Sequence, residues 1–117
     1  MMKSQKKEAP TGDNLNPYTK EQIEAVIAAV AKVCKLKVYQ MIAGGKKRDI
    51  VDARHIAMFI INSELDVKYK DIAARFGVNR RAVNEVILFK DKFQENGLLY
   101  EKVNAAKAIV WPQSNAR

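Results

Sequence analysis

Two adjacent arginines in the second half of the chain are the side chains with the clearest chemistry. Arg80 and Arg81 follow Asn79, and the apolar residues after them recur at the spacing of a helix that begins at this point. A guanidinium group can donate two parallel hydrogen bonds to the major-groove edge of guanine, or to a phosphate. We therefore take these three residues, together with Asn84, as candidates for contacts to DNA.

A second group of basic residues precedes the longest apolar helix that the sequence predicts. Lys46, Lys47 and Arg48 follow a pair of glycines, Gly44 and Gly45, which can act as a hinge. We expect this basic loop (Lys46, Lys47 and Arg48) to be mobile in the free protein and ordered on DNA. There it would contact phosphates and the minor groove. The segment lacks the preceding strand and the spacing of a nucleotide-binding P-loop.

The sequence shows no catalytic or metal-binding constellation. His55 is the only histidine, and Asp52 is its only carboxylate neighbour at helical spacing. A lone helical histidine is more often a surface or phosphate-contacting residue than a general base. The single cysteine, Cys34, lies on an apolar helix face, and no Cys/His cluster has the spacing of metal ligands. We therefore expect no enzyme activity, no metal and no cofactor.

The charge balance is strongly basic. The chain has 21 Lys and Arg against 13 Asp and Glu, which gives a net charge of +8 and a pI near 9.7. Such an excess favours a polyanionic partner, either nucleic acid or an anionic membrane surface. The most apolar run, residues 56–61, is too short to span a membrane, and no helix has a strongly basic polar face. A reducing cytoplasm fits the single cysteine and the missing secretory signal.

The arginine pair lies within residues 69–87, which have the pattern of a helix-turn-helix. Gly77 stands where a first helix must end, Val78 follows as an apolar plug, and Asn79 can cap the second helix. In this motif the second helix enters the major groove of DNA. The alternative is an ordinary helical hairpin. The apolar residues that define the two helices are Ile72, Ala73, Phe76, Val83, Val86 and Ile87.

The rest of the chain predicts an all-α fold, a single domain of five to six helices. A capping box at residues 19–22 begins the first helix, and a short second helix ends at the glycine pair. Asp49 or Asp52 begins a long third helix at the centre of the core. The second helix of the motif extends to about Gln94, where Asn96 and Gly97 follow, and a final helix ends before Pro112. The predicted core contains Ile56, Phe59, Ile60, Ile72, Phe76, Val83 and Ile87.

We expect residues 18–111 to form the domain. The segments 1–17 and 112–117 are polar and without periodicity, so we expect them to be disordered tails.

Four segments carry a resemblance to a known family. They are residues 33–42, the basic loop, residues 54–60 and residues 72–77. Together they are similar to the C-terminal DNA-binding domain of the bacterial replication initiator DnaA. The likeness covers nearly all of the predicted ordered body, and it has no gaps from Lys46 to Gly77.

The resemblance implies an all-helical domain whose helix-turn-helix reads the major groove of a short asymmetric site. It also implies that Lys46 takes the place of a minor-groove arginine in the basic loop. Arg54 and His55 take the places of a phosphate-contacting Arg-Gln pair, and Lys70 lies where contacts to the DNA backbone occur.

The chain departs from the family at the helix that would read bases. The family's motif there is Gly-Arg-Asp-His-Thr-Thr-Val, whereas residues 78–83 read Val-Asn-Arg-Arg-Ala-Val, which is one residue shorter. Asn79, Arg80 and Arg81 thus replace the base-reading Asp-His-Thr, so we expect a different target sequence. The initiator's ATPase domain is missing from the sequence, so we do not expect ATP-driven opening of an origin.

These observations predict a sequence-specific protein that binds double-stranded DNA. One role is an origin-binding or replication factor of a phage or mobile element. A second is a transcriptional regulator, because the shorter turn resembles that of ordinary repressors. A third is a protein–protein adaptor whose basic charge serves solubility. A second copy of the chain, or a replication or transcription protein, remains open as a further partner.

Overall fold

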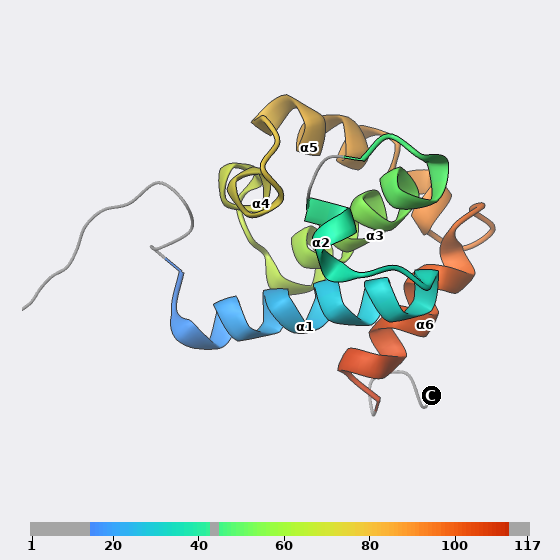
Figure 1. The fold of residues 1–117 in the computed structure, drawn as a ribbon, viewed down its shortest axis with the longest axis horizontal. Coiled ribbons are helices and arrows are strands. Elements are labelled where there is room, and N and C mark those ends of the chain that lie inside the picture. The colour runs from blue at the N-terminus through green and yellow to red at the C-terminus, as the bar shows by residue number, and fades with distance from the viewer. Residues whose placement is uncertain (1–14, 43–44, 113–117) are drawn as a thin grey trace, which may run out of the picture.

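The computed structural model describes residues 15–42 and 45–112, and these residues form six α-helices and one 3-10 helix (Figure 1). The helices are α1 (Pro17–Cys34), α2 (Val38–Ile42), α3 (Arg48–Leu65), α4 (Tyr69–Phe76), α5 (Arg80–Leu88), η2 (Lys90–Phe93) and α6 (Tyr100–Val110), of which η2 is the 3-10 helix. No strand occurs in these two ranges, and the all-α class is confirmed. None of the helices described is long and apolar enough to cross a membrane.

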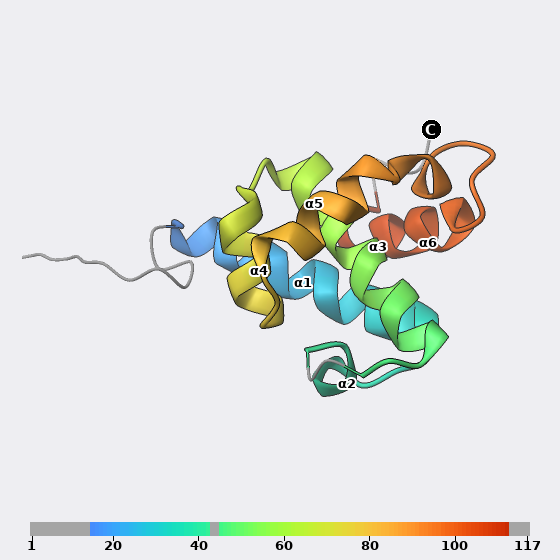
Figure 2. The same cartoon turned by 90° about the horizontal axis from the view of Figure 1, so that it is seen from above.

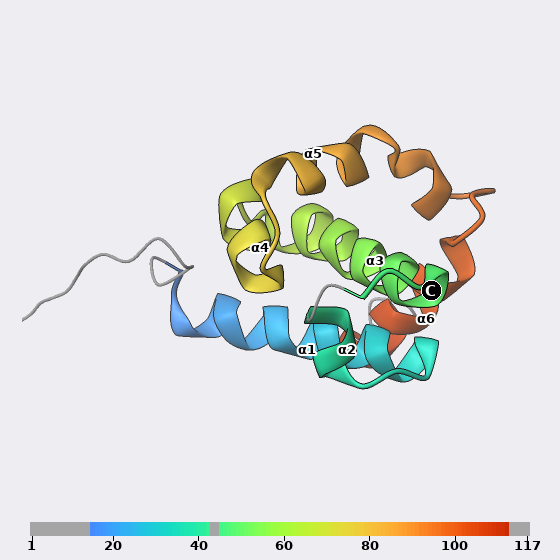
Figure 3. The same ribbon diagram turned by 45° about the horizontal axis from the view of Figure 1, so that its top comes forward.

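Helix α3 lies at the centre of the domain, as the sequence predicts. Helices α1 and α6 pack on one side of it, and α4 and α5 pack on the other (Figures 1 and 3). Helix α2 lies at one edge (Figure 2). All members of the predicted core are buried except Ile87, which is half-buried and packs against the others. Because α3 supports both α4 and α5, it holds these two helices at a fixed distance from α1.

The start of α1 differs from the prediction. Asn16 caps this helix, and its side-chain oxygen accepts a hydrogen bond from the backbone N–H of Thr19 at 2.7 Å. Pro17 occupies the first helical position, where its fixed φ suits a helix and its missing N–H costs nothing. The predicted capping box at residues 19–22 is therefore wrong, and α1 begins inside the segment predicted as a tail. Residues 1–14 and 113–117, also predicted as tails, lie outside the described residues.

The start of α3 also differs. Lys47 stands at the cap position and makes no side-chain capping bond, so neither Asp49 nor Asp52 caps the helix. Asp49 instead lies in the first turn, where its negative charge favours the positive end of the helix dipole.

Helix α5 ends at Leu88 rather than near Gln94. The chain leaves the helical path at Phe89, and η2 then brings the ring of Phe93 against α3. There it stacks on Phe59, with ring centroids 5.0 Å apart and planes inclined by 18°. The predicted break at Asn96 and Gly97 is confirmed as a tight turn, because a Cβ on Gly97 would collide with the main chain of η2.

Candidate nucleic-acid interface

The predicted turn between α4 and α5 is confirmed in its details. Gly77 ends α4 in the left-handed conformation with φ of 68°, and the next N–H, of Val78, donates to the carbonyl of Ala73 at 3.0 Å. Asn79 caps α5, since its side-chain oxygen accepts from the N–H of Ala82 at 2.9 Å. These bonds satisfy backbone groups on both sides of the turn, so the angle between the helices is set locally.

The inner side of this helix pair is packed against α3. Ala73, Phe76 and Val83 are buried, and Val78 is half-buried against the same core. The opposite side of α5 faces away from α1 and α6 (Figure 1). Arg80, Arg81 and the other polar residues of this face must therefore lie on the outside of the domain.

The exposed start of α5 borders a shallow hollow of about 500 Å³, lined by Tyr69, Arg80, Arg81 and Asn84. Three of these residues were predicted as DNA contacts. Tyr69 was not, and its only signal in the sequence was its place beside Lys70 at the start of α4. Within the described part of the chain, neither Arg80 nor Arg81 takes part in an ion pair or a side-chain hydrogen bond. Both guanidinium groups are therefore available to an acceptor.

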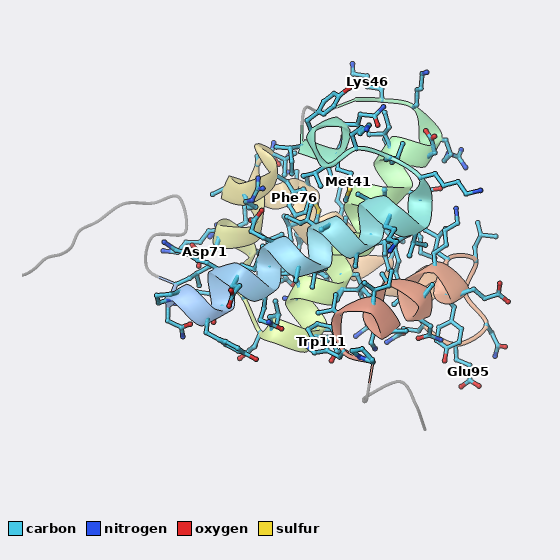
Figure 4. The ribbon with its side chains drawn as sticks, turned by 60° about the horizontal axis from the view of Figure 1, so that its bottom comes forward. Met41, Lys46, Asp71, Phe76, Glu95 and Trp111 are labelled. Atoms are coloured by element: carbon cyan, nitrogen blue, oxygen red, sulfur yellow. The ribbon has the colours of Figure 1, made fainter. Side chains whose placement is uncertain are left out.

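The basic loop follows α2 in the chain and leads into α3, where Lys47 is the cap and Arg48, predicted as part of the loop, is already the first helical residue. A Cβ on Gly77 would be 4.0 Å from the carbonyl oxygen of Ile42, so the end of α2 lies beside the turn of the motif. Lys46, Lys47 and Arg48 are exposed, and Figure 4 shows Lys46 at the outer edge of the domain, whereas Met41 and Phe76 lie inside. The structure thus brings the end of α2, which precedes the loop in the chain, beside the turn that precedes α5.

Gly45 is not a free hinge. A Cβ at this position would be 3.0 Å from Cδ1 of Ile50 and 3.3 Å from its Cγ2, so the backbone of Gly45 is packed closely against α3. Its carbonyl oxygen also accepts a hydrogen bond from Arg54. The expected hinge is therefore wrong at Gly45, and Gly44 lies outside the described residues.

Arg54 has partners that the sequence did not predict. Only 8% of the residue is exposed. Its Nε donates to the carbonyl of Met41, and its Nη2 donates to the carbonyl of Gly45, each at 2.9 Å. Burial lowers the pKa of this guanidinium, although arginine remains charged in proteins. In the free protein these nitrogen atoms face the main chain rather than solvent.

The remaining predicted contacts lie on two other helices. Lys70 is exposed in the first turn of α4, at the positive end of the helix dipole. His55 is half-buried on α3, and burial lowers its pKa, with a further lowering by Lys92 and Arg54 and an opposing effect of nearby carboxylates. A neutral imidazole keeps one N–H, which can donate to a phosphate oxygen.

A metal site has no support in the part of the chain that the structure describes. No group of three or more His, Cys, Asp and Glu residues there could hold a metal ion. Cys34 is half-buried against the core, and burial raises the pKa of its thiol, so at neutral pH this cysteine behaves as a small apolar residue.

Comparison with known proteins agrees with this geometry. A family model described as the bacterial dnaA protein helix-turn-helix matches residues 23–84. The match begins in α1, includes the basic loop and the whole of α4, and ends at Asn84 on α5. No curated protein and no solved structure matches the chain.

Proposed function

The chain belongs to the family of bacterial DnaA helix-turn-helix domains, which bind DNA, and we propose that it recognises a specific sequence in double-stranded DNA. The observation that carries this proposal is the exposed start of α5. Among the residues that the structure describes, Arg80 and Arg81 have no competing ion-pair partner, and Asn84 lies one turn further along the same surface. Arginine forms paired hydrogen bonds with guanine, and asparagine forms them with adenine.

The contacts to bases would be divided unevenly among the polar residues of this helix. The side-chain oxygen of Asn79 already caps α5, which leaves only its amide N–H groups for a base or phosphate. No such capping bond engages the side chains of Arg80, Arg81 and Asn84. We therefore assign base reading mainly to these three residues and place Tyr69, at the border of the same hollow, beside the sugar-phosphate backbone.

The remaining basic residues would contact the DNA backbone. The end of α2, which precedes the basic loop, lies beside the turn that precedes α5, and on this ground we place the loop at the minor groove next to the major groove that α5 would occupy. Lys70 and His55 would contact phosphates on either side of this position. Such contacts position the protein and supply affinity that does not depend on sequence.

Two biological roles follow from these features. We favour an origin-binding or replication-associated role on a phage or mobile element, because the match extends from α1 to Asn84 and includes the basic loop. A transcriptional regulator is the second candidate. The specific observation in its favour is the short turn, in which only Gly77, Val78 and Asn79 separate the two helices.

Selection of bound sites from a random pool of DNA duplexes would test the proposal. We expect the chain to enrich one motif that contains guanine, and Arg80→Ala and Arg81→Ala to lose part of that preference. Clustered asymmetric sites would support the origin-binding role, whereas a palindrome would support a dimeric regulator. No enrichment, together with no binding to random duplex at low salt, would overturn the proposal and favour an adaptor.

A further inference from the structure

Arg54 connects the last turn of α2 to the residue that precedes the basic loop. Its acceptors are the carbonyl of Met41, in the last turn of α2, and the carbonyl of Gly45, immediately before the basic loop. Among the described residues it is the only basic side chain that is buried. The guanidinium therefore ties the end of α2 and the start of the loop to the middle of α3.

The arginine side chain suits this position for a geometric reason. A guanidinium carries its N–H donors in one rigid plane, so two of them can serve two carbonyls at fixed positions at the same time. The ammonium group of a lysine is a single point on a flexible stem and cannot match that arrangement. A buried charge is also costly unless it is hydrogen-bonded. It would therefore cost free energy for the guanidinium to leave either carbonyl.

The basic loop begins one residue after the second of these contacts. Gly45 is held on one side by Arg54 and on the other by close packing against Ile50. The direction in which the main chain enters the loop at Lys46 is thus set in the free protein, and Arg48 at the other end of the loop is part of α3. A loop that is already ordered loses less conformational entropy on binding than a mobile one.

We propose that Arg54 is a positioning residue that sets the course of the basic loop toward the minor groove and acts on DNA only through that loop. This inference rests on the proposed function. It differs from the role implied by family resemblance, in which the side chain at this position touches a phosphate directly. The two roles make opposite predictions once the loop has lost its charges.

A double-mutant cycle separates them. Arg54→Lys and Arg54→Met are made in the wild-type loop and in the triple variant Lys46→Ala, Lys47→Ala, Arg48→Ala, and affinity for the selected site is measured at several salt concentrations. We expect the Arg54 substitutions to weaken binding about tenfold with the wild-type loop, because the loop would no longer be held in place before it binds. With the alanine loop we expect no further loss and no change in salt slope. A direct phosphate contact would instead make Arg54→Met, which removes the charge, lower that slope by about 0.9 in the alanine loop as well, and this result would overturn the proposal.

Trypsin digestion of the free protein tests the same inference without DNA. The loop contains three trypsin sites, at Lys46, Lys47 and Arg48. We expect Arg54→Lys to speed cleavage there at least severalfold relative to wild type and to the control Arg75→Lys, an arginine whose ion pair joins α1 to α4. Circular dichroism identifies any variant that has unfolded, and Arg54→Met, which keeps the volume without the charge, replaces Arg54→Lys in that case. Unchanged loop cleavage would overturn this inference alone, whereas failure of the wild type to bind DNA would overturn the proposed function.

Discussion

The guanidinium of Arg75 and the carboxylate of Glu24 form a two-pronged ion pair that joins α4 to α1. Nε of Arg75 lies 2.6 Å from Oε2 of Glu24, and Nη2 lies 2.7 Å from Oε1. The hydrogen bond to Glu24 raises the pKa of Arg75 and outweighs the effect of partial burial. Since α3 supports the inner side of the helix-turn-helix, this pair gives α4 a second point of attachment, at the edge of the domain.

Glu24→Gln should lower the free energy of unfolding by about 0.2–1 kcal/mol, the range measured for exposed ion pairs. The effect is small because both side chains remain in contact with solvent. Urea titration at low and high salt would measure it, and the difference from wild type should shrink at high salt. Glu21→Gln, on the exposed side of the same helix, is the control for charge alone. Equal losses for the two variants would show that the ion pair contributes nothing.

Phe76→Ala should lower the free energy of unfolding by about 3–5 kcal/mol. The ring is completely buried at the end of α4, directly before the turn, so its removal leaves a cavity beside α3. A loss of this size is a large share of the stability of a small domain, and DNA binding should fail only because the fold is lost. Chemical denaturation would measure the change, with the exposed Arg81→Ala expected within about half a kcal/mol of wild type. A wild-type melting curve for Phe76→Ala would contradict the packing described above.

The helix-turn-helix could be predicted from the sequence because its signals are local. Gly77 and Asn79 each act within a few residues of their own positions, and the apolar spacing of α4 and α5 needs only the 3.6-residue period. The same reasoning from local signals predicted the wrong cap for α1. Thr19 and Gln22 form an acceptable capping pattern, but Asn16 followed by Pro17 offered a better one three residues earlier.

Features that depend on distant residues could not be predicted. Nothing near Phe93 in the sequence indicates that its ring stacks on Phe59, and this contact accompanies the early end of α5. Arg54 stands in an apolar helix, which was the one available sign of burial, yet its carbonyl partners come from another part of the chain. The role of each predicted DNA contact stays a prediction.

Stability should fall on acidification partly because of His55. Its pKa lies below the usual value of about 6.5, since burial and then Lys92 and Arg54 disfavour the charged form. As the pH falls below that value, the unfolded chain takes up a proton before the folded one does, so folding is progressively disfavoured until the folded pKa is passed. His55→Gln should therefore lose less stability than wild type as the pH falls through and below about 6.5. Denaturation curves of both proteins would be measured across this range, because the carboxylates that the two proteins share affect both equally. Identical pH profiles would show that His55 does not contribute to the loss of stability.

The basic loop should supply much of the affinity that does not depend on sequence. Each phosphate contact that is removed lowers the slope of log K against log salt by about 0.9. The triple variant Lys46→Ala, Lys47→Ala, Arg48→Ala should thus bind random duplex more weakly and with a flatter salt dependence. A charge-matched control is the triple change of Lys32, Lys35 and Lys37 to alanine, at the end of α1 and before α2. A loop variant that keeps the wild-type slope would show that these residues are only solvated charges.

Arg80→Ala or Arg81→Ala should cost about 1–3 kcal/mol on the selected site and much less on random duplex. The reason is that paired hydrogen bonds to guanine exist only where the right base is present, whereas a phosphate lies at every position. The structure leaves both guanidinium groups exposed beside Asn84, so neither substitution disturbs the core. Fluorescence anisotropy on both kinds of duplex, at one salt concentration, would measure the ratio. One of the two arginines can touch phosphate alone and still leave the other to read a base, but equal losses on both duplexes for both variants would remove base reading from the start of α5.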